Sequence, residues 1–348
     1  MLSPDASKSY IEDILRSFLA EKQQAAATIH SSYEHLLEEI SRVALAGGKR
    51  LRPHMVFIGY GAYDSRIALV AAAHEILHIS LLIHDDIIDR EDTRHNEDTI
   101  HKRYNDGYYA SIADSSERLH FSTSAALLAG DILISAAHEL LARAELTSQQ
   151  HTLASEILSQ GILEVAGGQL LDSEAPFFQD TFDPIIIYRY KTASYSFIAP
   201  LLTGVSLSPK NYDTSTLGYV RDFATNLGIA FQIRDDTLGT FGNTATTGKT
   251  TTGDLREGKQ TLLIALFRNR ATNDQLLEFE KYFGNPNATE HQLESLKQSI
   301  EQSGALLEAT SIETSYKDTA VAALANIADS ELRNTLTDFI GYIDGRTA

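Results

Sequence analysis

Two runs of aspartate end two apolar stretches of the chain, and their spacing suits metal binding. Asp85, Asp86 and Asp89 close one stretch, and Asp235 and Asp236 close the other. On a helix, residues four apart share a face about one turn (~6 Å) apart, so the carboxylates of Asp85 and Asp89 repel each other unless a cation offsets their charge. Carboxylate oxygens suit Mg²⁺, especially when substrate phosphates complete its coordination. If the two helices face each other, the runs are expected to hold several Mg²⁺ ions around one diphosphate.

The elements that carry these runs are predicted to be helices. Apolar residues recur at helical spacing in nearly every segment, and sustained strand-type alternation is absent, which indicates an all-α fold. Long helices are expected over Ala68–Ile88, Leu119–Leu146 and Tyr212–Gly239 and from Asp183 to about Thr203, with three or four shorter ones between Lys259 and Arg346. Asp64 or Ser65 is expected to cap the first helix, and Pro184 directly after Asp183 is a helix-start signal.

Two stretches are predicted to be irregular, and each directly follows an aspartate run. Residues Arg90–Arg118 are polar and rich in His and Asp, and Thr240–Gly258 contains the sequence TATTGKTTTG. Loops of this length in a compact domain are usually lids or binding loops. Because no repeat, heptad register or low-complexity linker divides the chain, we expect one large helical domain over residues 1–348.

The composition of the 348-residue chain excludes some classes of function. Its 29 basic and 47 acidic residues give a net charge of -18, which argues against a nucleic-acid surface. No cysteine is available for a disulfide, a thiolate nucleophile or a Cys-based zinc site. The N-terminus lacks a basic-then-apolar signal, and the apolar runs are interpreted as too short to span a membrane. We therefore expect a cytoplasmic protein without a transmembrane segment.

Two further motif matches are weak. Gly248-Lys249-Thr250 is similar to the end of a nucleotide-binding P-loop, but that loop needs a preceding strand and a glycine where this chain has Asn243. His84 next to Asp85 is a pairing found in metal phosphohydrolases of the HD type, but one such pair on a helix indicates little. His84 is expected instead to pack beside the cavity.

Taken together, the motifs resemble those of the trans-isoprenyl (polyprenyl) diphosphate synthases of the geranylgeranyl or farnesyl type. Besides the aspartate runs, the resemblance rests on His78, Arg94, Gly47-Gly48-Lys49-Arg50-Leu51-Arg52-Pro53, Gly168-Gln169 with Asp172, Lys191-Thr192-Ala193, Phe231-Gln232, Gly248-Lys249 and Asp254 to Thr261 (DLREGKQT). It implies the isoprenoid synthase fold, a helical bundle with a central cavity. It also implies a homodimeric, Mg²⁺-dependent transferase that joins isopentenyl diphosphate to an allylic diphosphate, with three Mg²⁺ ions per active site.

The resemblance also implies roles position by position. Metal binding falls to Asp85, Asp89 and Asp235, with Asp86 and Asp236 beside them. The allylic diphosphate is surrounded by Arg94, Lys191, Thr192, Gln232, Lys249 and Lys259, of which Lys191 and Lys249 act with the metal ligands in catalysis. Isopentenyl diphosphate is held by Lys49, Arg52 and His78. Lysine and arginine suit these tasks because they form charge-assisted hydrogen bonds with phosphate oxygens.

The chain departs from the family pattern at two positions. His95 stands where the family usually has a second arginine that contacts isopentenyl diphosphate. We expect His95 to supply a weaker, pH-dependent contact, since histidine titrates near ~6.5. Gly239 replaces a third aspartate in the second run, a form that many relatives share.

The aspartate runs by themselves leave two other functions open. A class I terpene cyclase would use the same ionisation without a second diphosphate site, and a non-catalytic subunit of a heteromeric synthase would keep only the fold. In the resembled family, an aromatic residue just before the first aspartate run stops chain growth early. Ser80 and Leu81 occupy that level here, so geranylgeranyl diphosphate or a longer product is expected.

Overall fold

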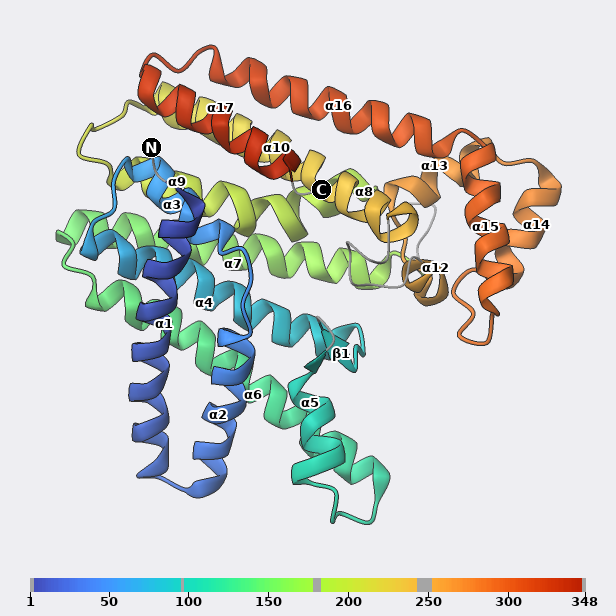
Figure 1. Cartoon of the computed structure of the whole chain (residues 1–348), viewed down its shortest axis with the longest axis horizontal. Coiled ribbons are helices and arrows are strands. Elements are labelled where there is room, and N and C mark those ends of the chain that lie inside the picture. The colour runs from blue at the N-terminus through green and yellow to red at the C-terminus, as the bar shows by residue number, and fades with distance from the viewer. Residues whose placement is uncertain (1–2, 95–96, 178–182, 243–251, 346–348) are drawn as a thin grey trace. The chain divides into compact units, whose positions relative to one another are not determined.

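Helices build nearly all of the described chain. The computed structural model describes residues 3–94, 97–177, 183–242 and 252–345. Within these residues, the strands β1 (Thr93–Arg94) and β2 (Glu97–Asp98) form one short antiparallel pair, and the other regular elements are helical (Figure 1). The all-α prediction is confirmed.

By their internal contacts the helices fall into two compact units. Unit 1 comprises residues 1–159 and 199–213, and unit 2 comprises residues 160–198 and 214–348. Unit 1 contains α1 (Pro4–Ala27), α2 (Ser31–Leu45), α3 (Leu51–Tyr60), α4 (Ser65–Ile88), both strands, α5 (Ile100–Arg103), the π-helix η1 (Tyr104–Tyr108), α6 (Ser115–Arg143) and α9 (Ala199–Leu207). The helix α7 (Ser148–Glu174) begins in unit 1 and ends in unit 2. The single domain expected from the sequence stays a prediction.

Unit 2 contains α8 (Pro184–Ile187), the π-helix η3 (Tyr188–Ile198), α10 (Thr214–Phe241), α12 (Gly253–Glu257), α13 (Leu262–Arg270), α14 (Asn273–Tyr282), α15 (Glu290–Gln302), α16 (Ala305–Leu324) and α17 (Ser330–Asp344). Aromatic and aliphatic side chains of α13 to α16 form one of its cores, in which the rings of Phe267 and Phe279 lie 4.9 Å apart. A smaller core, formed by Tyr188, Ile229, Ile233 and Leu262, lies between η3, α10 and α13. Because Ile229 and Ile233 belong to α10, this smaller core packs directly before the second aspartate run on that helix.

The helix α4 runs beside α6 within unit 1 and is buried along most of its length (Figure 1). It is apolar around most of its circumference, as expected for a helix packed on several sides. By length and mean hydropathy alone, both α4 and α6 could cross a membrane, which the sequence reasoning did not recognise. However, 72% of the most apolar window of α4 is buried inside the protein, so its apolar side chains serve as core.

The predicted helix starts are confirmed in detail. The carboxylate of Asp64 caps α4 by accepting a hydrogen bond of 2.8 Å from the backbone N–H of Arg66. Asp183 caps α8 in the same way, at 2.9 Å from the N–H of Ile185. Both caps satisfy amides that have no partner inside the helix.

Three expectations need correction. The helix expected to run on from Asp183 is divided into α8, η3 and α9, with π-helical geometry in its middle part. The described C-terminal region holds five helices, α13 to α17, where three or four were expected. The stretch Arg90–Arg118, expected to be irregular, contains the β1–β2 pair, α5, η1 and the start of α6. The strands β1 and β2, α5 and η1 have too few residues for apolar periodicity to reveal them.

Candidate functional site

The first aspartate run occupies the last turn of α4. Asp85 and Asp86 belong to the helix, and Asp89 is its C-cap, with its N–H donating to the carbonyl of Asp85 at 2.8 Å. The last turn of α4 contains no basic residue. Anions at this end of a helix are disfavoured by the helix dipole, so the run needs positive charge from elsewhere.

Arg94 supplies that charge from β1. Its Nε donates to Asp86 Oδ1 at 2.5 Å, and its Nη2 contacts Asp85 Oδ2 at 3.1 Å and Glu91 Oε2 at 3.2 Å. The pairing of Thr93 with Asp98 and of Arg94 with Glu97 holds the arginine in place. Burial raises the pKa of Asp86 to about 7, although the guanidinium of Arg94 opposes that rise. Sequence reasoning missed Glu91, which carries no spacing signal.

The basic residues predicted to hold isopentenyl diphosphate also lie in unit 1. Lys49 precedes α3, Arg52 lies in its first turn, and His78 lies on α4. Between the first two, Arg50 adopts a left-handed backbone conformation with φ of 49°. Its guanidinium donates to Glu75 Oε1 and to the carbonyl of Ala44, each at 2.8 Å.

This buried ion pair ties the segment that carries Lys49 and Arg52 to α4. The side chains of Arg50 and Glu75 are only 3% and 4% exposed. Glu75 lies three residues before His78, which places it on the adjoining turn of the same helix. The pair was not predicted, because Arg50 was part of a motif and Glu75 was not.

The residues expected to line the cavity floor occupy different sides of α4. Ser80 is fully buried, and its hydroxyl donates to the carbonyl of Gly130 on α6 at 2.9 Å. Leu81 is partly exposed and lies four residues before Asp85, hence on the same face. The role expected for Ser80 at the cavity floor stays a prediction, and its side chain also takes part in the packing of α4 on α6. His84 packs on α6, with Nε2 3.2 Å from the carbonyl of Leu127, and its expected place beside the cavity stays a prediction.

The second aspartate run lies near the end of α10, in unit 2. Asp235 is exposed, and Asp236 is partly buried. Asp236 Oδ2 accepts a hydrogen bond from the hydroxyl of Tyr188, and Asp236 Oδ1 accepts one of 2.7 Å from Nε2 of Gln232. Burial raises the pKa of Asp236 to about 7, and the negative charges of Asp254 and Asp235 raise it further, whereas the two hydrogen bonds lower it.

Several of the predicted basic and polar residues also lie in unit 2. Lys191 and Thr192 lie on η3, where Lys191 Nζ contacts Asp172 Oδ2 of α7 at 2.5 Å. The hydroxyl of Thr192 donates to Gln232 Oε1 at 2.7 Å. The close approach of α7 and η3 depends on Gly168, where an added Cβ would lie 2.2 Å from the backbone nitrogen of Lys191.

Gly239 has a structural role that the sequence did not reveal. A Cβ at this position would lie 2.5 Å from Oδ2 of Asp254, so that carboxylate would have to shift to admit a third aspartate side chain. Asp254 thus brings a third carboxylate to the second run from a different element, α12. Lys259, in the segment between α12 and α13, lies with Nζ 3.5 Å from Asp254 Oδ1.

Two predicted site residues, His95 and Lys249, lie outside the described residues.

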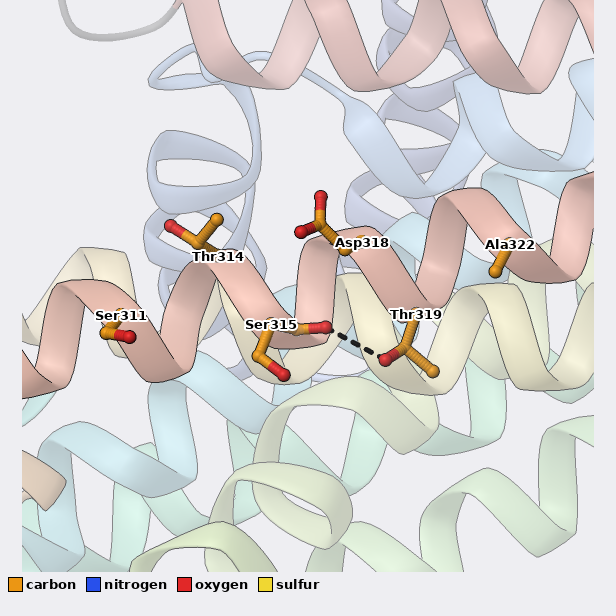
Figure 2. A pocket seen from close by; sticks show the side chains of 6 residues that line it. All are labelled: Ser311, Thr314, Ser315, Asp318, Thr319 and Ala322. Atoms are coloured by element: carbon orange, nitrogen blue, oxygen red, sulfur yellow. Dashed lines mark hydrogen bonds between the residues drawn. The ribbon is translucent and has the colours of Figure 1, made fainter.

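A separate hollow runs along α16, lined by Ser311, Thr314, Ser315, Asp318, Thr319 and Ala322 (Figure 2). The Thr319 hydroxyl donates to the carbonyl of Ser315 within that helix. The lining contains none of the predicted site residues, so the hollow is not part of the candidate site.

The residues of both groups fit Mg²⁺, the ion implied by the resemblance. Within the described parts of the chain, no three Asp, Glu or His side chains already form a complete metal site. Mg²⁺, however, is usually bound by one or two carboxylates and completes its octahedron with water and substrate phosphates. The donors near Arg94 and around Asp236 are carboxylate oxygens, which are the hard oxygen ligands that such an ion prefers.

Comparison with known proteins identifies the family. The family model described as polyprenyl synthetase matches residues 34–300. The geranylfarnesyl diphosphate synthase of Aeropyrum pernix is 32% identical over 310 residues, covering 86% of this chain and 90% of that protein. The geranylgeranyl diphosphate synthase of Sulfolobus acidocaldarius is 31% identical over 295 residues, covering 82% and 79%.

A solved structure gives the same result. The geranylgeranyl pyrophosphate synthase of Corynebacterium glutamicum, crystallised with isoprenyl diphosphate and magnesium, superimposes with a TM-score of 0.90 at 27% identity. The match covers 99% of this chain and 100% of that one. Because the family model matches more than half of the chain and a relative is 32% identical over 86% of it, this chain belongs to the polyprenyl synthetase family.

Proposed function

We propose that this prenyltransferase joins isopentenyl diphosphate to an allylic diphosphate in a Mg²⁺-dependent reaction. The observation that carries the proposal is the acidic end of α4, where the carboxylates of Asp85, Asp86 and Glu91 gather around the single guanidinium of Arg94. A site that concentrates negative charge and attracts a cation suits Mg²⁺ and the diphosphate that would complete its coordination.

The proposed site holds three Mg²⁺ ions. Its metal ligands are Asp85, Asp89 and Asp235, and Asp86 and Asp236 lie next to the metal sites. Bound Mg²⁺ would offset the charge that develops on the departing diphosphate. The side chains proposed to bind that diphosphate are Arg94, Lys191, Thr192, Gln232, Lys249 and Lys259. Their ammonium and guanidinium groups donate to phosphate oxygens where the new charge appears, which is electrostatic stabilisation of the transition state.

The chemistry after ionisation needs an apolar environment and no protein nucleophile. Loss of diphosphate leaves an allylic cation, the double bond of isopentenyl diphosphate attacks it, and a proton passes to the released diphosphate. The buried apolar residues that precede Asp85 on α4 support this step, because water near the allylic cation would quench the cation.

The proposed isopentenyl diphosphate site consists of Lys49, Arg52 and His78, with His95 as a weaker contact. Because the allylic diphosphate would use other basic residues, Lys49→Ala and Arg52→Ala are expected to raise the KM for isopentenyl diphosphate more than that for the allylic primer. Steady-state kinetics with each substrate varied in turn measures this difference. Equal effects on both KM values would contradict separate sites.

The proposed product is geranylgeranyl diphosphate or a longer chain. Relatives named as geranylgeranyl and geranylfarnesyl diphosphate synthases support this product, and so does the aliphatic Leu81 on the face of Asp85. A terpene cyclase or a non-catalytic subunit would not elongate a primer. Purified protein is incubated with Mg²⁺, isopentenyl diphosphate and each allylic primer in turn, and the products are chromatographed. Cyclic hydrocarbons, or no product from any primer, would overturn the proposal.

We also propose that the protein is a cytoplasmic homodimer and that residues 1–348 act as one domain. An exposed apolar face on α6, with Leu127 at 50% and Leu128 at 55% exposure, supports burial against a second copy. Light scattering should give twice the mass of 38.3 kDa. Calorimetry should show one cooperative unfolding transition, since a single domain unfolds as a unit.

A further inference from the structure

The side chain of Tyr188 lies at a junction of unit 2 that the proposed mechanism does not use. Tyr188 begins η3 three residues before Lys191 and is only 5% exposed. Its ring belongs to the small core with Ile229, Ile233 and Leu262. Its hydroxyl therefore has a fixed position on a rigid, well-packed ring.

That hydroxyl joins two elements of the candidate site. It donates to Asp236 Oδ2 on α10 and accepts a hydrogen bond of 2.8 Å from the backbone N–H of Leu262, the first residue of α13. The same junction fixes the end of the segment that carries Lys259, because this segment leads directly into α13.

The other carboxylate oxygen of Asp236 extends the connection to η3. Gln232 Nε2 donates to Asp236 Oδ1 at 2.7 Å, and Gln232 Oε1 accepts from the Thr192 hydroxyl at 2.7 Å. One series of hydrogen bonds therefore runs from Thr192 through Gln232 and Asp236 to Tyr188 and the start of α13. With both oxygens held, the carboxylate of Asp236 cannot rotate without breaking a buried hydrogen bond.

We infer that Tyr188 is a positioning residue that fixes the orientation of Asp236, and thereby the second aspartate run, for binding the Mg²⁺–diphosphate group. The inference rests on the proposed function. Tyr188 acts through Asp236 and does not itself contact the metal or the substrate. Preorganised ligands bind more tightly because less conformational freedom is lost on binding, so loss of the hydroxyl should weaken binding of the metal–diphosphate group.

The variant Tyr188→Phe removes the hydroxyl and keeps the ring in the core. Titration calorimetry with inorganic pyrophosphate in the presence of Mg²⁺ should show an affinity about tenfold lower than that of the wild type, as expected when a hydrogen bond to a charged group is lost. The KM for the allylic primer should rise with it, and the KM for isopentenyl diphosphate should stay unchanged. A general loss of folding would instead change both KM values.

Tyr316→Phe is the matched control. Tyr316, on α16, packs against the same small core but is not part of the series of hydrogen bonds, so its variant should bind Mg²⁺–pyrophosphate like the wild type. Thermal unfolding of both variants separates a loss of stability from a loss of orientation. Equal pyrophosphate affinities for Tyr188→Phe and wild type would overturn the inference.

A double variant tests whether Tyr188 acts through Asp236. If it does, adding Tyr188→Phe to Asp236→Asn should lower the pyrophosphate affinity by less than twofold beyond the single Asp236→Asn change. A further tenfold loss would contradict the inference. Binding of pyrophosphate is measured without turnover, so the measurement tests the role of Tyr188 even if the wild type elongates no primer. Failure to elongate any primer would overturn the proposed function alone.

Discussion

At the residue scale, the acidic runs are placed where they cost stability. Asp85 and Asp86 lie at the end of α4 that disfavours anions, and Arg94 offsets only part of their charge. A protein selected for stability alone would not gather carboxylates there. On the proposed function, their position is explained by a bound cation, which would supply positive charge.

Removal of a metal ligand should therefore affect turnover far more than folding. Asp85→Ala and Asp235→Ala should each lower kcat/KM by about a hundredfold or more, since a bound metal contributes several kcal/mol to transition-state stabilisation. Steady-state rates and circular dichroism measure the two effects. Asp92→Ala is the control, because the side chain of Asp92 is 62% exposed and its carboxylate forms ion pairs with His101 and Lys102. Near-normal activity of Asp85→Ala or Asp235→Ala would refute the metal-binding role of that residue.

The buried pair of Arg50 and Glu75 should matter for stability. Glu75→Ala leaves the buried guanidinium of Arg50 with only the more distant carboxylate of Glu12, 3.9 Å from Nε, which should cost roughly 3–5 kcal/mol of unfolding free energy. Chemical denaturation measures this loss. Lys8→Ala, which removes the Lys8–Glu12 pair at the surface, should cost less than about 1 kcal/mol. Similar losses in both variants would show that burial of the Arg50 pair is not decisive.

At the element scale, residues on different sides of α4 have different surroundings. His78, Leu81, Asp85 and Asp89 are spaced three or four residues apart and share one face. Ser80 lies on the side that packs against α6 and hydrogen-bonds to the carbonyl of Gly130. Adjacent residues of one helix thus lie on different sides, Ser80 on the side packed against α6 and Leu81 on the face of Asp85.

Two aromatic substitutions on α4 should distinguish these two sides. Leu81→Phe should shorten the product by blocking the cavity below Asp85, with little effect on the first condensation. Ser80→Phe should instead lower the unfolding free energy by about 1–3 kcal/mol, because the space beside Gly130 is already filled. Product chromatography and thermal unfolding distinguish the two. Chain shortening by Ser80→Phe without loss of stability would place the cavity floor on the other side of α4.

At the scale of the whole molecule, burial of ionisable groups makes stability depend on pH. Burial lowers the pKa of His74 to about 3 and that of His54 to about 4. Each histidine therefore binds a proton in the unfolded chain before it does so in the folded one. Their contribution to stability is complete above pH ~6.5 and is lost as the pH falls towards the folded values. Burial raises the pKa of Asp86 and of Asp236 to about 7, which acts in the opposite direction.

Because these effects oppose each other, the histidine contribution is measured by difference. His74, whose Nε2 lies 3.1 Å from the Thr203 hydroxyl, is replaced by glutamine. At pH 7.5 the wild type should be the more stable protein. By pH 5 its advantage over His74→Gln should shrink by about 2 kcal/mol, at roughly 1.4 kcal/mol per pH unit below 6.5. A difference in unfolding free energy that does not change with pH would show that His74 is not desolvated in the folded chain.

The sequence by itself determined the helical class, the main helices with their caps at Asp64 and Asp183, and the two aspartate runs. These features depend on residues a few positions apart, through helical periodicity and side chains that cap the nearest amides. The family pattern added Arg94, Lys191, Thr192 and Gln232. Of these, the structure places Arg94 and Gln232 in contact with an aspartate run and Thr192 in contact with Gln232, whereas Lys191 contacts Asp172.

Only the tertiary structure decided how those residues are held. The contact of Tyr188 with Asp236 joins residues 48 positions apart, and that of Arg50 with Glu75 joins residues 25 apart. The proximity of Asp254 to Gly239 and the burial of Ser80 against Gly130 depend likewise on how one helix packs on another. No local pattern encodes such pairs, because their distance is set by the packing of helices and not by spacing along the chain.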